Sequence, residues 1–421
     1  MKVILLNPNT YLEDIMHPPI GLAILATLCE GEGHDVEILD LPISGMSDES
    51  AVEWIIERGA AVVGFTVTTK IFASAARIAS GLKRVNGGIT TVMGGPHPTF
   101  AGRTVLERCP QFDYVFAFEA EYSFPEFLSA LESHADVRRI PGVGSRAGAE
   151  IVINQPADPI PNLNELPIAK RTYFPMDRYL ERDNETTLLT ARGCPNSCAF
   201  CSTSRMGRQL RMRSPENVGV ELRSLIDMGF RSIFVSDDTF TTSIKRVDAL
   251  CKEFAEVPGD WRWTCNMRLS DARQEILRPM KESGCYRVFV GVESSSTKIL
   301  GRINKRCPAT EAVELCRMIK AFGIEVHASF LLGLPGETEG TIWNTVGLAK
   351  EMKPDMISFN VLTPYPGTLL YERPEEYGIV MPDPFWFEKA DWFRHPVCGT
   401  KDVSPERLFR LAIEAYTEFV K

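Results

Sequence analysis

Short apolar runs alternate with amphipathic stretches at βαβ spacing over residues 1–135, and this alternation limits the fold more than any other feature of the sequence. Five buried strands are predicted here, at Val3–Leu6, Val36–Leu39, Val62–Thr66, Thr91–Met93 and Tyr114–Phe116. Amphipathic helices are predicted between and after them, at Gly21–Cys29, Val52–Glu57, Phe72–Val85 and Tyr122–Leu131. The pattern therefore predicts an α/β domain with a doubly wound parallel sheet, whose ligands bind beyond the carboxyl ends of the strands.

The same alternation resumes after residue 184 and predicts a second α/β domain over residues 185–370. Its six candidate strands are Thr187–Thr190, Ser232–Ser236, Trp263–Met267, Arg287–Val290, Val326–Leu331 and Met356–Val361. Six βα units are too few to close an eight-stranded barrel. We therefore expect a partial (β/α)6 barrel with its chemistry at the carboxyl ends of the strands.

Two further segments flank this second domain. Residues 136–184 are proline-rich and show no periodic pattern, so they are predicted to be a linker that packs on both neighbours. Residues 371–421 are an aromatic-rich extension that ends in an amphipathic helix at Pro405–Lys421. The aromatic side chains of this extension are expected to cap the open barrel or to line a substrate pocket: Tyr377, Phe385, Trp386, Phe387, Trp392 and Phe393.

Composition limits the partners and the compartment. The net charge of -9 argues against a nucleic acid as the main partner, because phosphate neutralisation needs a surplus of lysine and arginine. No apolar run reaches the ~18–20 residues of a membrane span, and the start of the chain is too weakly apolar for a signal peptide. We therefore expect a cytoplasmic, reducing compartment, in which a cluster among the 11 cysteines indicates metal chemistry and not disulfides.

Three cysteines lie just past the first predicted barrel strand with C-x3-C-x2-C spacing, at Cys194, Cys198 and Cys201. Three thiolates on one loop can ligate three irons of a 4Fe-4S cubane and leave the fourth iron open to a substrate or cofactor. A zinc site would show a fourth cysteine or histidine nearby, but the nearest histidines, His134 and His327, are remote in sequence. An electron carrier would require four cysteine ligands, so the spacing favours an enzyme.

The motif C-x3-C-x-aromatic-C after the first strand of a six-unit barrel resembles the signature of the radical S-adenosylmethionine (SAM) superfamily. The resemblance implies that Cys194, Cys198 and Cys201 ligate the cluster and that Phe200 flanks the adenine of SAM. Phe200 could instead be an ordinary core residue. It also implies that an external one-electron reductant of the flavodoxin or ferredoxin type drives cleavage of SAM to a 5′-deoxyadenosyl radical.

Other residues at the predicted barrel mouth match weaker motifs of the same superfamily. Asp237 and Asp238 end the second strand, where the resemblance places groups that receive the SAM amino group, although the pair could equally cap the next helix. Glu293 and Ser294 resemble the ribose-binding position, and Arg268 is expected to face the SAM carboxylate or to form a surface ion pair. Two loop residues complete the expected SAM site: Gly333 after the fifth strand and Tyr365 after the sixth.

Four segments of the first domain, 4–8, 18–22, 33–36 with Asp40, and 94–98, resemble the cobalamin-binding domain that precedes the barrel in one branch of the superfamily, the class B radical SAM methyltransferases. The resemblance implies a Rossmann-like (flavodoxin-like) cobalamin domain over residues 1–135. The motif D-x-H-x-x-G, which supplies an imidazole to cobalt in other corrinoid proteins, is absent. The cobalamin-binding residues that the resemblance implies are Pro19, Gly21, Leu22, Thr66, Thr68, Lys70, Gly94, Gly95, His97 and Glu119.

One stretch departs from that branch. Its members carry G-E-G-E near the fifth strand, whereas this chain has Phe118, Glu119, Ala120 and Glu121. If the two glycines of the branch let the cobalamin nucleotide tail approach closely, binding in this chain is altered or weaker.

Taken together, the resemblance implies a cobalamin-dependent radical SAM enzyme that methylates an unactivated carbon of a small molecule. The alternative is another radical outcome on the same scaffold: cyclisation, ring contraction, carbon–carbon coupling or aminocarboxypropyl transfer. Methylthiolation of RNA or protein would require a cysteine-rich first domain, and only Cys29 and Cys109 lie there.

Overall fold

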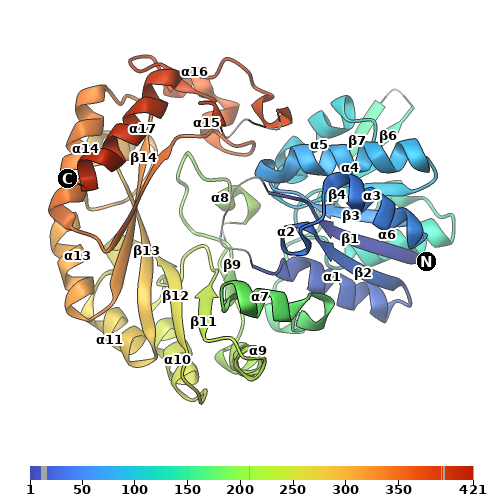
Figure 1. Cartoon of the computed structure of the whole chain (residues 1–421), viewed down its shortest axis with the longest axis horizontal. Coiled ribbons are helices and arrows are strands. Elements are labelled where there is room, and N and C mark those ends of the chain that lie inside the picture. Colours follow the sequence, from blue (N-terminus) through green and yellow to red (C-terminus); the bar gives the residue numbers. More distant parts are fainter. Residues whose placement is uncertain (11–16, 149, 208, 390, 392–393, 421) are drawn as a thin grey trace. The chain divides into compact units, whose positions relative to one another are not determined.

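The computed structural model describes residues 1–10, 17–148, 150–207, 209–389, 391 and 394–420. The chain divides into two compact units, of which the first comprises Met1–Asp183 with Phe387–Ala390 and the second comprises Asn184–Trp386 with Asp391–Lys421. Figure 1 shows both as α/β units with parallel strands flanked by helices. Among the described residues, no helix combines the length and the apolar character needed to cross a membrane.

The first unit contains a seven-stranded sheet in the order β2-β1-β3-β4-β5-β6-β7. Its first five strands pair in parallel, as predicted: β1 Lys2–Asn7, β2 Asp35–Asp40, β3 Val62–Thr66, β4 Thr90–Gly94 and β5 Tyr114–Phe116. The order 2-1-3-4-5 is flavodoxin-like, and in such sheets ligands bind where the strand order reverses, beyond the carboxyl ends of β1 and β3. This confirms the predicted doubly wound architecture.

The last two strands of this sheet come from the segment expected to be a linker. β6 (Val143–Ala147) pairs antiparallel with β5, and β7 (Glu150–Ile153) pairs antiparallel with β6. Their runs are short and lie among prolines and glycines, so no periodicity marked them in the sequence. Further along, Ile160, Leu163 and Leu166 pack on Ile24 and Leu28 of helix α1 (Ile20–Gly31), so this part of the segment is tied to the first unit.

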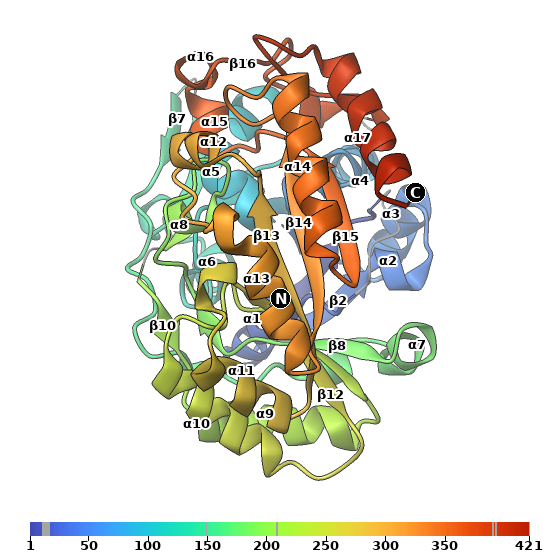
Figure 2. The same ribbon diagram turned by 90° about the vertical axis from the view of Figure 1, so that its left-hand side faces the viewer.

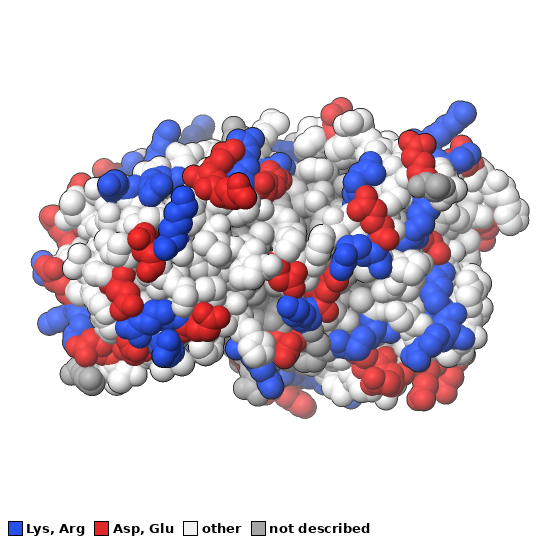
Figure 3. All heavy atoms as spheres, turned by 90° about the horizontal axis from the view of Figure 1, so that it is seen from above, with Lys and Arg blue, Asp and Glu red and all other residues white. Residues whose placement is uncertain are grey.

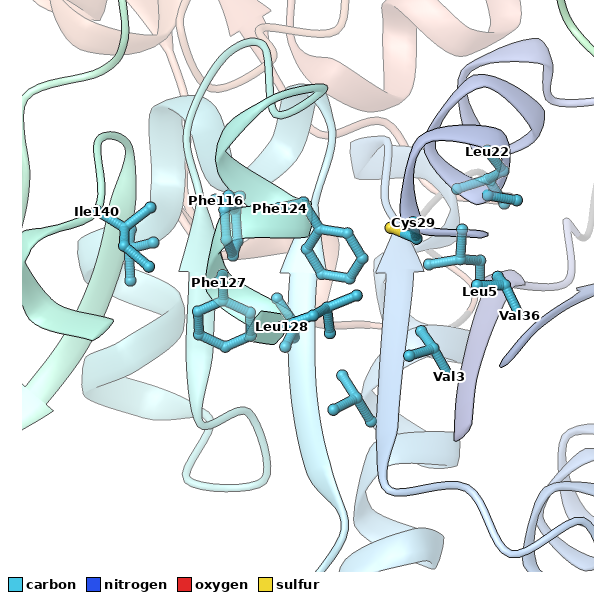
Figure 4. Close-up of a cluster of buried hydrophobic side chains, with 14 of the residues drawn as sticks. Val3, Leu5, Leu22, Cys29, Val36, Phe116, Phe124, Phe127, Leu128 and Ile140 are labelled. Carbon is cyan, nitrogen blue, oxygen red and sulfur yellow. The ribbon is translucent and has the colours of Figure 1, made fainter. Parts of the chain in front are cut away.

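Helices cover both faces of the first sheet because each strand buries side chains on both sides. A hydrophobic cluster fills the space between the sheet and helices α1 and α6 (Ser123–Glu132); Figure 4 shows Leu5, Leu22 and Phe127 within it. The opposite face carries the contacting pair α3 and α4, and α5 packs on β5. The remaining helical elements of this unit are α2 Leu41–Ser44, α3 Asp48–Glu57, η1 Thr69–Ile71, α4 Phe72–Val85, α5 Pro96–Arg108, η2 Val137–Arg139, η3 Leu163–Glu165, η4 Arg171–Tyr173 and α7 Met176–Arg182.

The second unit contains a six-stranded, wholly parallel sheet in the order β15-β14-β13-β12-β11-β8. Its strands are β8 Glu185–Leu188, β11 Ser232–Val235, β12 Arg262–Met267, β13 Cys285–Glu293, β14 Glu325–Leu332 and β15 Met356–Val361. Helices follow the strands along the outer face: α9 Pro215–Asp227, α10 Ile244–Ala255, α11 Gln274–Glu282, α12 Thr297–Arg302, α13 Ala312–Ala321 and α14 Glu339–Met352. The predicted partial (β/α)6 barrel is confirmed.

The first barrel strand ends two residues earlier than predicted. The backbone N–H groups of Thr190 and Ala191 donate to the carboxylate of Asp237 and do not continue the strand ladder. The end of β8 is thus set by the side chain of Asp237, which lies 47 positions after Thr190 in the sequence. No local sequence pattern could indicate this.

The C-terminal extension forms one long helix and several short elements. Helix α17 (Pro405–Val420) lies along α14 and β15 (Figure 2), where the Tyr416 hydroxyl accepts a hydrogen bond from the Phe359 N–H at 2.9 Å. It thereby covers the edge strand of the sheet. The short elements of this unit are β9 Ala191–Arg192, α8 Thr203–Met206, β10 Arg211–Met212, η5 Leu269–Asp271, η6 Ala309–Glu311, α15 Leu369–Glu372, α16 Pro374–Tyr377, β16 Ile379–Val380 and β17 Gly399–Thr400. The element η7 Trp386–Glu388 begins in this unit and continues into the first.

Candidate functional site

The loop that carries the three cysteines follows β9 at the carboxyl end of the barrel's first strand. Backbone bonds fix it: Cys194 N–H donates to the Gly207 carbonyl at 3.2 Å, and Cys201 N–H donates to the Cys198 carbonyl at 3.1 Å. Gly193 has a φ of +96°, and a Cβ there would lie 2.5 Å from the Gln209 carbonyl oxygen, so only glycine fits. Backbone hydrogen bonds and the left-handed conformation of Gly193 therefore contribute to the shape of the loop.

The three thiols are half-buried, free of disulfides and close enough to influence one another. Burial raises the pKa of Cys198, and Cys201 and Cys194 raise it further, whereas Lys305 and Arg268 lower it. Within the described part of the chain, no three His, Cys, Asp or Glu side chains stand close enough together to hold a single metal ion. A multi-iron cluster binds each thiolate at a different corner, so three neighbouring thiols flanked by cations fit such a cluster.

A buried ion pair links the end of β13 to this loop. Glu293 has a left-handed φ of +68°, where the pairing of β13 with β14 is irregular, and its carboxylate accepts a hydrogen bond from the Lys305 ammonium at 3.1 Å. Burial lowers the pKa of Lys305, but the charges of Glu293 and Cys198 outweigh it and the net shift is upward. The ammonium also lies 5.9 Å from the centre of the Phe200 ring. Lys305 was not predicted from the sequence to be a site residue. The only signal that could have indicated it is its place in the basic run R-I-N-K-R.

Phe200 has surroundings of two kinds. Its ring is half-buried and packs against a core cluster that includes Ala199, Ile303 and Leu334. This agrees with the alternative prediction that Phe200 is a core residue. At the same time the Lys305 ammonium lies over the ring, so Phe200 borders the charged region around Cys198.

The two adjacent aspartates after β11 differ in their surroundings. Asp237 is buried and accepts hydrogen bonds from Thr190 N–H (2.6 Å), the Thr190 hydroxyl (2.5 Å) and Ala191 N–H (2.9 Å). Burial raises its pKa to about 6. Asp238 is exposed overall, but partial burial of its carboxylate raises the pKa of this group. Hydrogen bonds from the Gly193 N–H and the Thr203 hydroxyl lower the pKa and offset part of this rise. Asp238 therefore faces the cysteine loop, whereas Asp237 anchors the end of β8.

The alternative role of this aspartate pair as a helix cap is wrong. The following helix, α10, is capped by Ser243, whose hydroxyl accepts a hydrogen bond from the Arg246 N–H at 3.4 Å. Arg246 in turn donates to the Thr190 carbonyl at 2.7 Å, so this helix also supports the end of β8.

The remaining predicted SAM residues lie at the ends of β12, β13, β14 and β15. Arg268 donates to the Arg306 carbonyl at 2.6 Å and acts electrostatically on Cys198. Ser294 is buried and accepts a hydrogen bond from Ser296 N–H at 3.2 Å. Tyr365 packs edge-on against Trp386, with ring centres 5.6 Å apart. Trp392 and Phe393 of the aromatic extension lie outside the described residues.

The loop after β14 is held by a carboxyl group that the sequence did not single out. Glu337 is fully buried and accepts hydrogen bonds from the Gly333 N–H at 2.8 Å and the Leu334 N–H at 3.0 Å. Burial raises its pKa to about 7. Gly333 itself has a φ of +92°, and a Cβ there would lie 2.7 Å from Leu408 of α17. The glycine is thus required by packing within this unit.

In the first unit, the loops after β3 and β4 are joined to each other. Val67 N–H donates to the Gly94 carbonyl at 2.8 Å, and His97 N–H donates to the Val67 carbonyl at 2.9 Å. Gly95 has a φ of +98°, and a Cβ there would lie 2.9 Å from backbone atoms of Val67. The predicted residues of these two loops therefore share one surface at the carboxyl edge, where Thr66 is half-buried and Thr68 and Lys70 are exposed.

His97 lies inside the core of the first unit. Its Nδ1 is 3.1 Å from the Thr69 hydroxyl, and its ring packs between Phe72 and Phe387 with centre distances of 4.6 and 4.8 Å. Burial lowers its pKa to about 3, so the imidazole is neutral. The buried His97 ring therefore supports the loop after β3 through its contact with Thr69.

The stretch near β5 that differs from the G-E-G-E motif also has an unusual backbone conformation. Phe118 adopts a left-handed φ of +66°, a conformation that glycine takes without strain. Its N–H donates to the Thr99 hydroxyl at 2.9 Å, and its ring lies 6.2 Å from that of Phe100. The predicted Glu119 accepts a hydrogen bond from the Ile160 N–H at 2.9 Å. The substitution therefore keeps the glycine-type turn but fills it with a large side chain.

The predicted residues at the start of α1 precede and begin that helix. The Pro19 carbonyl accepts a hydrogen bond from the Leu22 N–H at 2.9 Å; Leu22 is buried, and Gly21 is exposed with open space around its Cα. Asp40, one of the residues that carry the resemblance to the cobalamin-binding domain, is buried and accepts hydrogen bonds from Asn7 at 2.9 Å and from the Tyr179 hydroxyl. Tyr179 belongs to α7, in the segment expected to be a linker, so no motif indicated it.

Comparisons with known proteins agree with this architecture. Residues 14–128 match the B12 binding domain, and residues 188–349 match the radical SAM superfamily. The chain is 31% identical over 432 aligned positions to an uncharacterised methyltransferase from Pyrococcus horikoshii, covering 100% of this chain and 92% of the relative. It is 29% identical over 394 residues to the anaerobic magnesium-protoporphyrin IX monomethyl ester cyclase of Rubrivivax gelatinosus, covering 89% of this chain and 70% of that enzyme.

Solved structures share the fold. The methyltransferase TsrM from Kitasatospora setae, solved with cobalamin and a [4Fe-4S] cluster, superposes with a TM-score of 0.80 at 20% identity over 100% of this chain and 89% of TsrM. The cobalamin-dependent radical enzyme OxsB superposes with a TM-score of 0.71 at 18% identity over 89% of this chain and 56% of OxsB.

The fold and the three-thiol loop define a radical SAM enzyme with a B12 binding domain. This chain belongs to the cobalamin-dependent branch of the radical SAM superfamily. Its cofactors are accordingly a 4Fe-4S cluster, SAM and cobalamin.

Proposed function

We propose that this enzyme methylates an unactivated carbon of a small molecule. The observation that carries the proposal is the likeness to a methyltransferase over the whole chain, combined with the three-thiol loop at the mouth of a partial barrel. We assign cobalamin to residues 1–135, the radical chemistry to residues 185–370, and supporting roles to the linker 136–184 and the extension 371–421.

Within the barrel, Cys194, Cys198 and Cys201 would hold the cluster. When bound, the cluster supplies one electron that cleaves SAM, and cobalamin supplies the methyl group. Arg268 and Lys305 place positive charge beside Cys198, where they would bind the SAM carboxylate and offset the charge of the thiolates. The other side chains proposed to contact SAM are Phe200, Asp237, Asp238, Glu293, Ser294, Gly333 and Tyr365.

The residues that would contact cobalamin lie on the exposed part of the carboxyl edge of the first sheet. Thr66, Thr68 and Lys70 would face the corrin from the loop after β3, with Gly94 and Gly95 beside them. His97 and Leu22 would act from within the core, by supporting the loop after β3 and the start of α1. Pro19, Gly21 and Glu119 complete the proposed set.

The reaction is tested with anaerobically reconstituted enzyme, a reductant and SAM that carries a deuterated methyl group. The proposal predicts 5′-deoxyadenosine, S-adenosylhomocysteine and a small-molecule product that gains the labelled methyl group, each detected by mass spectrometry. A product without the label contradicts methylation but leaves a radical SAM reaction standing. No 5′-deoxyadenosine under any condition contradicts both.

Cyclisation is the second candidate, because the chain is 29% identical to a magnesium-protoporphyrin IX monomethyl ester cyclase over most of its length. A cyclase would release 5′-deoxyadenosine without forming S-adenosylhomocysteine in proportion to product. The ratio of these two compounds therefore separates the candidates even before the product is identified. Either reaction requires a small-molecule substrate and an external one-electron reductant.

A further inference from the structure

One stretch of the barrel unit has a one-sided charge. Residues 294–310, which run from the end of β13 through α12 to η6, contain four lysine or arginine side chains and no aspartate or glutamate, in a chain whose net charge is -9. Figure 3 shows acidic and basic side chains interspersed over one face of the molecule. Lys298, Arg302 and Arg306 are exposed, whereas Lys305 turns inward to Glu293.

This basic stretch is bound directly to the loop that carries the three cysteines. The Ile303 carbonyl accepts a hydrogen bond from the Ala199 N–H at 2.8 Å, and the Asn304 side chain donates to the Ser197 carbonyl at 3.1 Å. Ser197 and Ala199 lie inside the C-x3-C-x2-C motif, on either side of Cys198. A protein that covered the exposed basic side chains would therefore lie against the outside of the cysteine loop.

We propose that the exposed basic side chains of residues 294–310, which are Lys298, Arg302 and Arg306, form the docking surface for an acidic one-electron carrier protein, which is the external reductant that the proposed function requires. Electron tunnelling slows steeply with distance, so the donor has to bind close to the cysteine loop. Opposite charge speeds such an encounter and orients it. The reduced carrier gives up one electron to the cluster and leaves oxidised by one electron, so no atom is transferred.

Charge reversal at two exposed positions tests this surface. In Lys298→Glu/Arg306→Glu, neither altered side chain belongs to the proposed SAM or cluster site. The matched control is Arg278→Glu/Arg317→Glu, which makes the same change in net charge at exposed positions of α11 and α13. Thermal melts establish that all three proteins are folded.

Calorimetric titration with a purified acidic flavodoxin measures the Kd at 50 and 300 mM NaCl, for protein with and without the reconstituted cluster. The parent and the control are expected to bind alike and to lose affinity as salt screens the charges. The Lys298→Glu/Arg306→Glu variant is expected to bind at least tenfold more weakly at low salt. Unchanged affinity in this variant, or equal weakening in the control, overturns the docking surface.

A chemical reductant separates this inference from the proposed function. With dithionite, all three proteins are expected to form 5′-deoxyadenosine at equal rates. With reduced flavodoxin, only the Lys298→Glu/Arg306→Glu variant is expected to be slow, and the control should match the parent. If no protein cleaves SAM with dithionite, the proposed function fails while the calorimetric result still decides the docking surface. Tighter binding of a DNA duplex or anionic vesicles than of flavodoxin would overturn the commitment to a carrier protein.

Discussion

At the scale of single residues, the candidate site is organised around Cys198. The thiol is coupled to its two motif partners, and it is faced by the cations of Arg268 and Lys305. Lys305 is in turn held by Glu293 at the end of β13. Each of these groups compensates a charge that would otherwise be costly to bury.

The role of the motif cysteines is tested by Cys198→Ala. Removing one of three thiolates leaves the cluster without a corner ligand, so reconstituted protein should lose most of its ~4 irons per chain and its 5′-deoxyadenosine formation. Iron analysis and the absorbance near 400 nm measure the loss. Cys307→Ala is the control, because Cys307 is half-buried close to Lys305 but lies outside the motif. Full cluster content in the Cys198→Ala variant would show that this thiol is not a ligand.

Phe118→Gly tests the departure near β5. Glycine removes the conformational cost of a left-handed phenylalanine, which is ~1 kcal/mol. It also removes the ring contact with Phe100, which stabilises the fold by a similar amount. Stability should therefore change by less than ~1 kcal/mol, while cobalamin should bind several-fold tighter because the turn opens. Equilibrium dialysis with hydroxocobalamin measures the affinity. Weaker cobalamin binding in this variant would mean that the phenylalanine itself contacts the cofactor.

At the scale of elements, buried carboxyl groups hold the ends of two barrel strands, one from a distant part of the sequence and one from the same loop. Asp237 ends β8, and Glu337 holds the turn that follows β14. Both are buried, and both have raised pKa values, about 6 and about 7. The stability of these two strand ends therefore depends on the protonation of the two carboxyl groups.

Glu337→Gln tests this dependence. Because the folded pKa is about 7 and the usual value is 4.5, the folded protein holds a proton that the unfolded chain releases between these pH values. The stability of the parent should fall as pH rises from 4.5 to 7, by on the order of 2–3 kcal/mol, and then level off. Glutamine keeps the acceptor oxygen and cannot ionise, so this part of the pH dependence should vanish.

Urea unfolding of the barrel unit at pH 5 and pH 8 measures the effect. Glu351→Gln, at an exposed position of α14, serves as the control and should unfold like the parent at both pH values. Equal pH dependence in the parent and the Glu337→Gln variant would show that Glu337 is ionised in the fold throughout this range.

At the scale of the whole molecule, the chain consists of two compact units with separate sheets and separate proposed cofactors. Each sheet presents loops at its carboxyl edge, and each edge carries a glycine with positive φ whose close backbone neighbours exclude a Cβ, Gly95 in the first unit and Gly193 in the second. The cofactors should therefore stabilise the two units separately.

Scanning calorimetry tests this separation. Hydroxocobalamin at about 100 times its Kd should stabilise the first unit by ~2.7 kcal/mol, which raises one melting transition by roughly 5–10 °C. Cluster reconstitution should raise only the other transition. The Cys198→Ala variant should keep the cobalamin shift and lose the cluster shift. A single transition that responds to both cofactors would contradict independent units.

The strands and the cysteine loop were predictable from the sequence because their signals are local. Buried strands are contiguous apolar runs, so β3, β5 and β15 begin and end at the predicted residues. The spacing of Cys194, Cys198 and Cys201 predicted a multi-iron site because one loop has to present all three thiols. Local patterns, however, do not show which residues from distant parts of the sequence contact these strands and this loop.

The tertiary structure decided the rest. Lys305 lies between Glu293 and Cys198 only because the segment after α12 binds the cysteine loop through Ile303. His97 is a neutral core residue only because Phe72 and Phe387 enclose it. Burial and pairing between distant residues set the charge of these groups, so the sequence by itself determined the fold and the cluster motif, whereas the electrostatics of the site arise only when the chain folds.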